Sequence, residues 1–253
     1  MLDPLPVPTF EGDPPWVRRL IKAQPEVVLM GPYMAYLLAL ALQERFPASW
    51  LAVPIAFRGL VGLWAVWLFR RHLPPLGRPH VLPALVCGVL SAGLWVGGQY
   101  LFNRLGLGGD LFKMVLAPFK GGWPAGPEVV DPTVGLTPLA WWSQAVLRIA
   151  VASTTVPLVE ELFWRAFLLR ALIDWNRFDR VPLGQFTWFS FLGTSLLSCL
   201  QHPAQWGVSV LCWFAFNGLF YWKKSILFLV IVHGVTNLTL YLYVLAAGDW
   251  QFW

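Results

Sequence analysis

Two adjacent glutamates and an arginine stand in an apolar stretch of the sequence. Glu160 and Glu161 are followed by Arg165 within the run VEELFWRAFLLR. On a helix, Glu161 and Arg165 are spaced i, i+4 and can pair, whereas Glu160 points about 100° away from Glu161. An ionisable group in such a stretch is costly and needs a reason. A glutamate left without that partner in a poorly solvated cavity suits a general base, although an ion cluster that only joins helices explains the same residues.

Two histidines and an asparagine stand in other apolar stretches. His202 precedes Pro203, where a helix should break and open space. His233 and Asn237 are spaced i, i+4 and share one helix face. Such side chains beside a spare carboxylate can position a water molecule, take its proton and donate hydrogen bonds to an oxyanion. Together with Glu160, these residues are therefore candidates for a catalytic site.

The composition requires a membrane around most of this chain. Of the 253 residues, 57% are hydrophobic and only 12% are charged, about half the charged share of a usual soluble domain. The net charge of +5 comes from basic residues in short loops between apolar stretches, which is typical of charge that orients membrane helices. We therefore expect an integral membrane protein in contact with the lipid bilayer and without a nucleic-acid partner.

Seven apolar stretches predict an all-α fold, a polytopic bundle of about seven transmembrane helices within a range of six to eight. They are residues 27–42, 50–69, 81–102, 138–173, 186–202, 206–222 and 225–247. A crossing needs about 20 residues, so the fourth stretch is too long for one straight helix. Pro157 follows three consecutive residues with hydroxyl groups, and we expect a broken or kinked helix near it. In the third stretch, Gly93 and Gly97 form a GxxxG pair that predicts close helix contact.

The distribution of lysine and arginine predicts the orientation of the bundle. If the N-terminal segment and the loops after the second, fourth and sixth stretches share one face, that face carries 11 of the 18 Lys and Arg residues. The opposite face carries four, and three lie within stretches. The positive-inside rule then places residues 1–25 in the cytoplasm. We expect one membrane domain, 1–253, with an extramembrane or interfacial loop at 103–137 and a catalytic motif core at 157–240.

The order of the polar motifs resembles the CAAX protease and bacteriocin-processing family. The run from Glu160 to Arg165 is similar to its EExxxR motif. His202 falls where its FxxxH motif supplies a histidine, and HGVTN, beginning at His233, is similar to its HxxxN motif. Runs such as PYMAYLLALALQERFP and VPLVEELFWRAFLLR resemble a bacterial subgroup of CAAX prenyl protease-related proteins associated with exosortase and PEP-CTERM sorting systems.

This resemblance implies an intramembrane endopeptidase of the type II CAAX prenyl endopeptidase kind, located in a bacterial inner membrane. Its substrate would be a membrane protein or a lipidated peptide, either prenylated or bearing a sorting signal, and a sorting-system protein would be a partner. Two departures, Ser198 in place of the FxxxH phenylalanine and Ala166 in place of a frequent glycine, concern packing first. The implied catalytic residues are Glu160 and His202, which activate water, and His233 and Asn237, which stabilise the oxyanion, with Glu161 and Arg165 as the supporting pair.

The residues leave other readings open. Glu160, His202 and His233 are suitable zinc ligands and would leave one coordination position free, although the sequence has no HExxH motif. The resemblance favours a glutamate mechanism without a cofactor, with zinc as the alternative. An ion-coupled transporter and a non-catalytic membrane scaffold are the alternatives from other functional classes.

The two histidines pose a geometric problem for any shared site. A straight fifth helix would leave His202 near the external face, whereas His233 follows closely after the cytoplasmic start of the seventh stretch. The two side chains can meet only if helices are tilted, short or broken. Pro157 and Pro203 provide the breaks, and irregular backbone at this depth requires a wet cavity or burial in protein.

Overall fold

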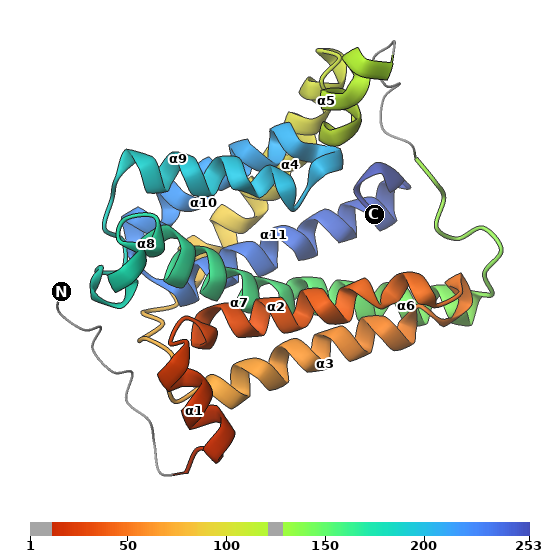
Figure 1. The fold of residues 1–253 in the computed structure, drawn as a ribbon. Helices are drawn as coiled ribbons and strands as arrows, with labels where there is room; N and C mark the ends of the chain where they lie inside the picture. Colours follow the sequence, from red (N-terminus) through yellow and green to blue (C-terminus); the bar gives the residue numbers. More distant parts are fainter. Residues whose placement is uncertain (1–11, 121–128) are drawn as a thin grey trace.

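The computed structural model describes residues 12–120 and 129–253, and all regular structure in these residues is helical (Figure 1). The long helices are α2 (Val27–Ala41), α3 (Ala52–Phe69), α4 (Val81–Arg104), α6 (Pro138–Ser153), α10 (Trp206–Lys223) and α11 (Ile226–Ala247). The shorter helices are α1 (Pro15–Ala23), α5 (Leu111–Lys120), α7 (Thr155–Glu161), α8 (Leu169–Ala171) and α9 (Trp188–Leu197). The predicted all-α class is confirmed. Parts of the predicted N-terminal segment and loop, residues 1–11 and 121–128, lie outside the described residues.

Within the part of the chain that the structure describes, four segments are long and apolar enough to cross a membrane. They are Val27–Arg45, Ala52–Phe69, Val81–Arg104 and Ile226–Ala247, the first, second, third and seventh of the predicted stretches. The remaining three stretches are also helical, as α6 with α7, α9 and α10, but they are not among the segments that satisfy both length and hydropathy. The number of seven crossings therefore remains a prediction.

The outer faces of the spanning helices are apolar. Leu60 on α3 is 67% exposed, and Leu82 and Leu90 on α4 are 73% and 67% exposed. Large exposed leucines on the outer faces of two helices would be unfavourable in water, whereas lipid tails solvate them. These faces support the assignment of the bundle to a membrane.

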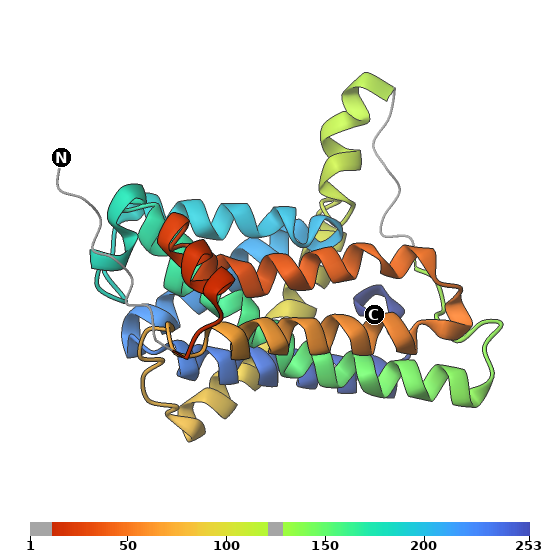
Figure 2. The same cartoon turned by 60° about the horizontal axis from the view of Figure 1, so that its bottom comes forward.

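Helix α11 occupies the centre of the bundle and positions the site. It packs against α4, α6, α7 and α10, while α2 and α3 pack together and α9 packs on α10. Phe228, Leu229, Val232 and Val244 on α11 are fully buried. Figure 2 shows that α5, in contrast, stands away from the other helices.

The close contact of α4 is made by a different glycine from the predicted pair. A Cβ atom at Gly88 would lie 2.8 Å from the Val232 carbonyl oxygen of α11, whereas nothing lies within 4 Å of a Cβ atom at Gly93 or Gly97. The GxxxG expectation was wrong because Gly93 and Gly97 face outward, where both are exposed. Gly88, on the face of α4 toward α11, is the glycine that permits the two helices to approach closely.

The predicted break in the fourth stretch is confirmed. Helix α6 ends at Ser153, and Thr154 has non-helical dihedrals, with φ −124° and ψ −66°, before α7 begins. Pro157 lies in the first turn of α7 and has no N–H group to donate back toward α6. Helix α11 covers the freed carbonyls, because Asn237 Nδ2 donates a 2.8 Å hydrogen bond to the Ala152 oxygen and Gly234 lies against the Ser153 oxygen.

The glycine contact generates a stability prediction. Gly88→Ala should destabilise the protein by about 1 to 3 kcal/mol, because the new methyl group overlaps backbone of α11. That loss corresponds to a fall of about 2 to 4 °C in the unfolding midpoint per kcal/mol. Gly93→Ala, in the same helix, is the matched control and should leave the midpoint unchanged or slightly higher. Thermal unfolding in detergent measures both, and equal midpoints for the two variants would contradict the packing of α4 on α11.

Candidate active site

A cavity of about 780 Å³ lies among the helices at the level of the broken segment. Its walls come from α2, α3, α6, α7, α10 and α11, and most of them are aliphatic or aromatic. A largely apolar cavity with a few converging polar groups is the usual form of a small-molecule or peptide site. The predicted catalytic residues that line it are Glu160, His202, His233 and Asn237. The structure thus brings all four to one cavity.

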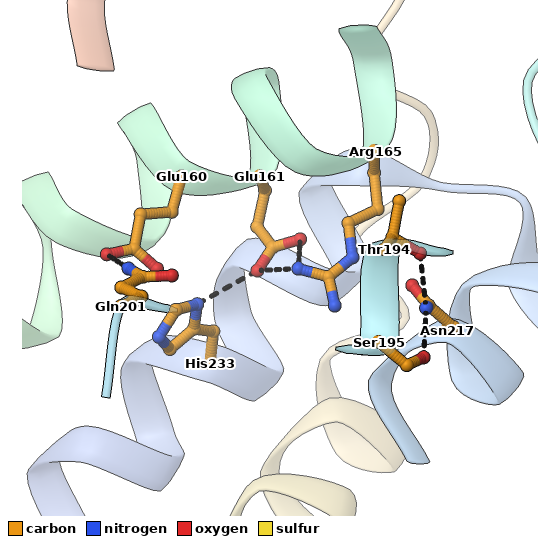
Figure 3. Close-up of polar contacts among 8 residues, drawn as sticks. All are labelled: Glu160, Glu161, Arg165, Thr194, Ser195, Gln201, Asn217 and His233. Atoms are coloured by element: carbon orange, nitrogen blue, oxygen red, sulfur yellow. Dashed lines mark hydrogen bonds and ion pairs between the residues drawn. The ribbon is translucent and has the colours of Figure 1, made fainter. Parts of the chain in front are cut away.

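The supporting pair lies behind the cavity wall, in a fully buried position. Arg165 Nη1 is 2.9 Å and 3.1 Å from the two carboxylate oxygens of Glu161, and neither side chain is exposed (Figure 3). The guanidinium also lies over the Trp213 ring, 5.1 Å from its centroid. The i, i+4 pairing expected from the spacing is present, and the cation is further stabilised by the aromatic ring.

Glu161 has a second partner that the sequence did not indicate. His233 Nδ1 lies 2.8 Å from the Glu161 carboxylate, so one carboxylate joins the helix after the break to α11 (Figure 3). An ionised carboxylate can only accept, and Nδ1 must therefore carry the hydrogen. This contact fixes the His233 ring and leaves Nε2 as the nitrogen that can act in the cavity.

Glu160 has different surroundings from Glu161. It lines the cavity and is only 4% exposed to the exterior. One of its oxygens accepts a hydrogen bond from Gln201 Nε2, and the other has no partner among the described residues (Figure 3). Glu160 and Glu161 therefore point in different directions, as predicted for adjacent residues of a helix. Gln201 was missed, although its polar side chain next to His202 in an apolar stretch was a usable signal.

The loop after α9 brings His202 toward His233. Helix α9 ends at Leu197, a 3₁₀ turn covers Ser198–Leu200, and His202 itself is non-helical. The His202 ring lies 6.0 Å from the Trp213 ring, and the His233 ring lies 6.1 Å from the same indole. A short, broken fifth segment therefore resolves the geometric problem that a straight helix would pose.

A polar network attaches α9 to α10 and supports this loop. Asn217 Nδ2 donates to the hydroxyl oxygens of Thr194 at 2.9 Å and Ser195 at 3.0 Å (Figure 3). Ser198, which replaces the family's phenylalanine, accepts a 3.1 Å hydrogen bond from the Ser209 hydroxyl. All these groups are buried, where paired polar atoms fix one packing arrangement. Ser198 therefore links the 3₁₀ turn after α9 to α10 through a hydrogen bond.

The segment that carries Arg165 is a π-helix. It covers Leu162–Leu168, directly after Glu161, and ordinary α-helix resumes in α8. Single π-helical turns are rare and frequently occur at functional sites. Sequence patterns of apolar residues do not distinguish such a turn from an α-helix, so this feature was not predicted.

The cavity does not contain an assembled metal site. Within residues 12–120 and 129–253, no group of three or more His, Cys, Asp or Glu side chains is placed to hold a metal ion. Glu160, His202 and His233 would therefore have to move to bind zinc in the manner of the alternative prediction.

The buried pair generates a prediction about coupling. Arg165→Met leaves the Glu161 carboxylate without its cation and should destabilise the protein by about 3 to 5 kcal/mol. Glu161→Gln should also destabilise it, and the double variant should cost less than the sum, because the second change removes the charge that the first left unpaired. The comparison is made by unfolding in detergent. Arg165→Met combined with Glu44→Gln, an exposed glutamate, should be additive, and additivity in the buried pair would contradict the assigned contact.

Comparison with known proteins gives one match. Residues 141–239 match the family model described as type II CAAX prenyl endopeptidase Rce1-like. No curated protein and no solved structure matches the chain significantly. The matched segment contains all three motifs and the helix break, and it includes every residue of the buried cluster around Glu161. The segment from 141 to 239 is therefore similar to the type II CAAX prenyl endopeptidase Rce1-like domain.

Proposed function

We propose that this protein is an intramembrane endopeptidase in which Glu160 activates the water that hydrolyses the peptide bond. The observation that carries the proposal is the position of Glu160, a buried carboxylate on a cavity wall with one oxygen free. The match to an Rce1-like domain supports the reaction class. A carboxylate in this position can take a proton from a molecule that enters the cavity.

The proposed reaction is a direct attack by water. Glu160 removes one proton from the water while His202 orients it, and the water oxygen bonds to the carbonyl carbon of the substrate. The oxyanion that forms is stabilised by donors on α11. The carbon–nitrogen bond then breaks, and Glu160 returns the proton to the leaving amine. No covalent enzyme intermediate is required.

The donors proposed for the oxyanion are His233 and Asn237. The Glu161 carboxylate holds Nδ1 of His233, so Nε2 is the ring nitrogen that would donate to the oxyanion. Asn237 commits one amide hydrogen to the Ala152 oxygen, and its amide carries a second hydrogen. Glu161 thus positions His233 in addition to pairing with Arg165.

The proposed substrate is a membrane-associated protein segment, prenylated or bearing a sorting signal. The cavity wall is mainly aliphatic and aromatic, which suits apolar side chains or a lipid group. We place the protein in a bacterial inner membrane, as the family resemblance implies, and the charge distribution supports residues 1–25 in the cytoplasm. A sorting-system protein as partner is part of this proposal.

Replacement of the base provides the main test of this function. Glu160→Gln keeps the size of the side chain but removes its basicity, and cleavage of a farnesylated peptide should fall by about 100-fold or more. Unfolding in detergent should stay close to wild type. Glu26→Gln, at the start of α2, is the control and should cleave normally. A wild-type rate in Glu160→Gln would mean that another residue is the base.

The same experiment separates the other functional classes. A scaffold would retain its biological role in Glu160→Gln. An ion-coupled transporter would lose flux in that variant, while the wild type would never yield a cleaved product.

The zinc alternative has its own test. Proteolysis by the purified protein should survive prolonged incubation with a strong chelator, because the proposed water activation uses a carboxylate. The rate before and after dialysis is the measurement. Loss of activity that zinc alone restores would replace the glutamate mechanism with metal-activated water.

A further inference from the structure

Two arginines lie on the wall of the cavity that contains Glu160. Arg58 belongs to α3 and Arg148 belongs to α6. Arg58 is 8% exposed, and Arg148 is partly buried. The catalytic mechanism proposed above uses neither residue.

Among the described residues, neither arginine has an acidic partner. The ion pairs found in residues 12–120 and 129–253 involve neither Arg58 nor Arg148. Arg58 Nη1 donates a 2.7 Å hydrogen bond to the neutral Gln43 side chain, and its Nε has no partner among the described residues. Arg148 Nε donates a long 3.4 Å hydrogen bond to the Tyr241 hydroxyl. The two positive charges also repel each other.

Aromatic rings offset only part of this cost. Arg58 lies 5.7 Å from the centroid of the Tyr36 ring, and Arg148 lies 4.9 Å from that of Trp253. Cation–π contacts contribute less than an ion pair would in a poorly solvated site. Two like charges on the wall of a membrane cavity are costly and usually mark a functional site. An anion that enters the cavity would neutralise the positive charges of Arg58 and Arg148.

Helix α2 connects the surroundings of Glu160 to Arg58. Tyr33 contacts Phe163, three residues beyond Glu160, with ring centroids 4.9 Å apart. Arg58 contacts Tyr36, about 4.5 Å beyond Tyr33 along α2, and Gln43, which lies in the 3₁₀ turn after α2 and roughly 15 Å beyond Tyr33. An extended peptide covers that range with about two to four residues. A substrate at Glu160 can therefore reach Arg58 with a nearby acidic group, and Arg148 lines the same cavity.

We propose that Arg58 and Arg148 form an anion-binding subsite of this cavity, which takes a carboxylate or phosphate group. The planar guanidinium matches either group and can bind it through two hydrogen bonds. The inference rests on the proposed function in one respect, that the anion belongs to the substrate or to a lipid that accompanies it. The subsite would then fix the distance between the acidic group and the bond that is cleaved.

The test measures binding without turnover, in the Glu160→Gln protein. The probes are an N-acetylated apolar tetrapeptide with a free C-terminal carboxylate and the same peptide as its C-terminal amide. We expect the acid to bind at least tenfold more tightly than the amide. Arg58→Gln and Arg148→Gln should each remove this preference, while Arg58→Lys should keep part of it. Arg70→Gln, an exposed arginine at the end of α3 that stacks on Trp67, is the control and should retain the full preference.

A second arm tests whether the anion comes from a lipid. The same variants are placed in nanodiscs of phosphatidylcholine with and without phosphatidylglycerol, and bound phosphatidylglycerol is counted by mass spectrometry. Loss of bound phosphatidylglycerol in Arg58→Gln and Arg148→Gln, without an acid preference for the peptide, would assign the subsite to a lipid phosphate. If neither probe distinguishes these variants from Arg70→Gln, while all unfold like the parent, the subsite is refuted.

The outcome is separable from that of the proposed function. Arginine-dependent binding of the acid, in a wild-type protein that cleaves no peptide, would sustain the subsite and reject the protease. Cleavage by the wild type without any effect of the arginines would reject the subsite alone.

Discussion

The carboxylate of Glu161 is shared by two cationic or hydrogen-bonding partners from distant parts of the chain. Arg165 reaches it from the π-helical turn, and His233 reaches it from α11. A fully buried carboxylate is strongly destabilising when it loses its partners, so these contacts fix α7 and α11 relative to one another. Glu160 is the preceding residue of the same helix and consequently faces the cavity. The Glu161–Arg165 ion pair thus helps to orient Glu160 toward the cavity.

Irregular backbone is concentrated around this cluster. The break at Thr154, the π-helix that follows Glu161 and the 3₁₀ turn before His202 all border the same region. Backbone of this kind within a membrane protein must be covered by protein or line a wet cavity. Asn237 covers the first break by donating to Ala152, and the cavity adjoins the rest. The features that disrupt regular helices are therefore the ones that place the histidines and Glu160 together.

Local sequence patterns predicted the helices well because each depends on neighbouring residues. Long apolar runs located the principal helices, and Pro157 after three hydroxyl residues located the break. The contact of His233 with Glu161 and that of Gln201 with Glu160 join residues far apart in the chain. A local pattern can mark such a polar residue but does not identify its partner. The same limit explains the failed GxxxG prediction, since the spacing of Gly93 and Gly97 does not state which face of α4 meets α11.

The central claim, that Glu160 supplies the base, is tested most directly by chemical rescue. Glu160→Ala removes the carboxylate and leaves room for a small anion beside His202. Added formate should restore part of the cleavage of a farnesylated peptide in Glu160→Ala, with a dependence on formate concentration, and should restore none in Glu161→Ala. Rescue of Glu161→Ala instead, or full activity of Glu160→Ala without formate, would contradict the assignment.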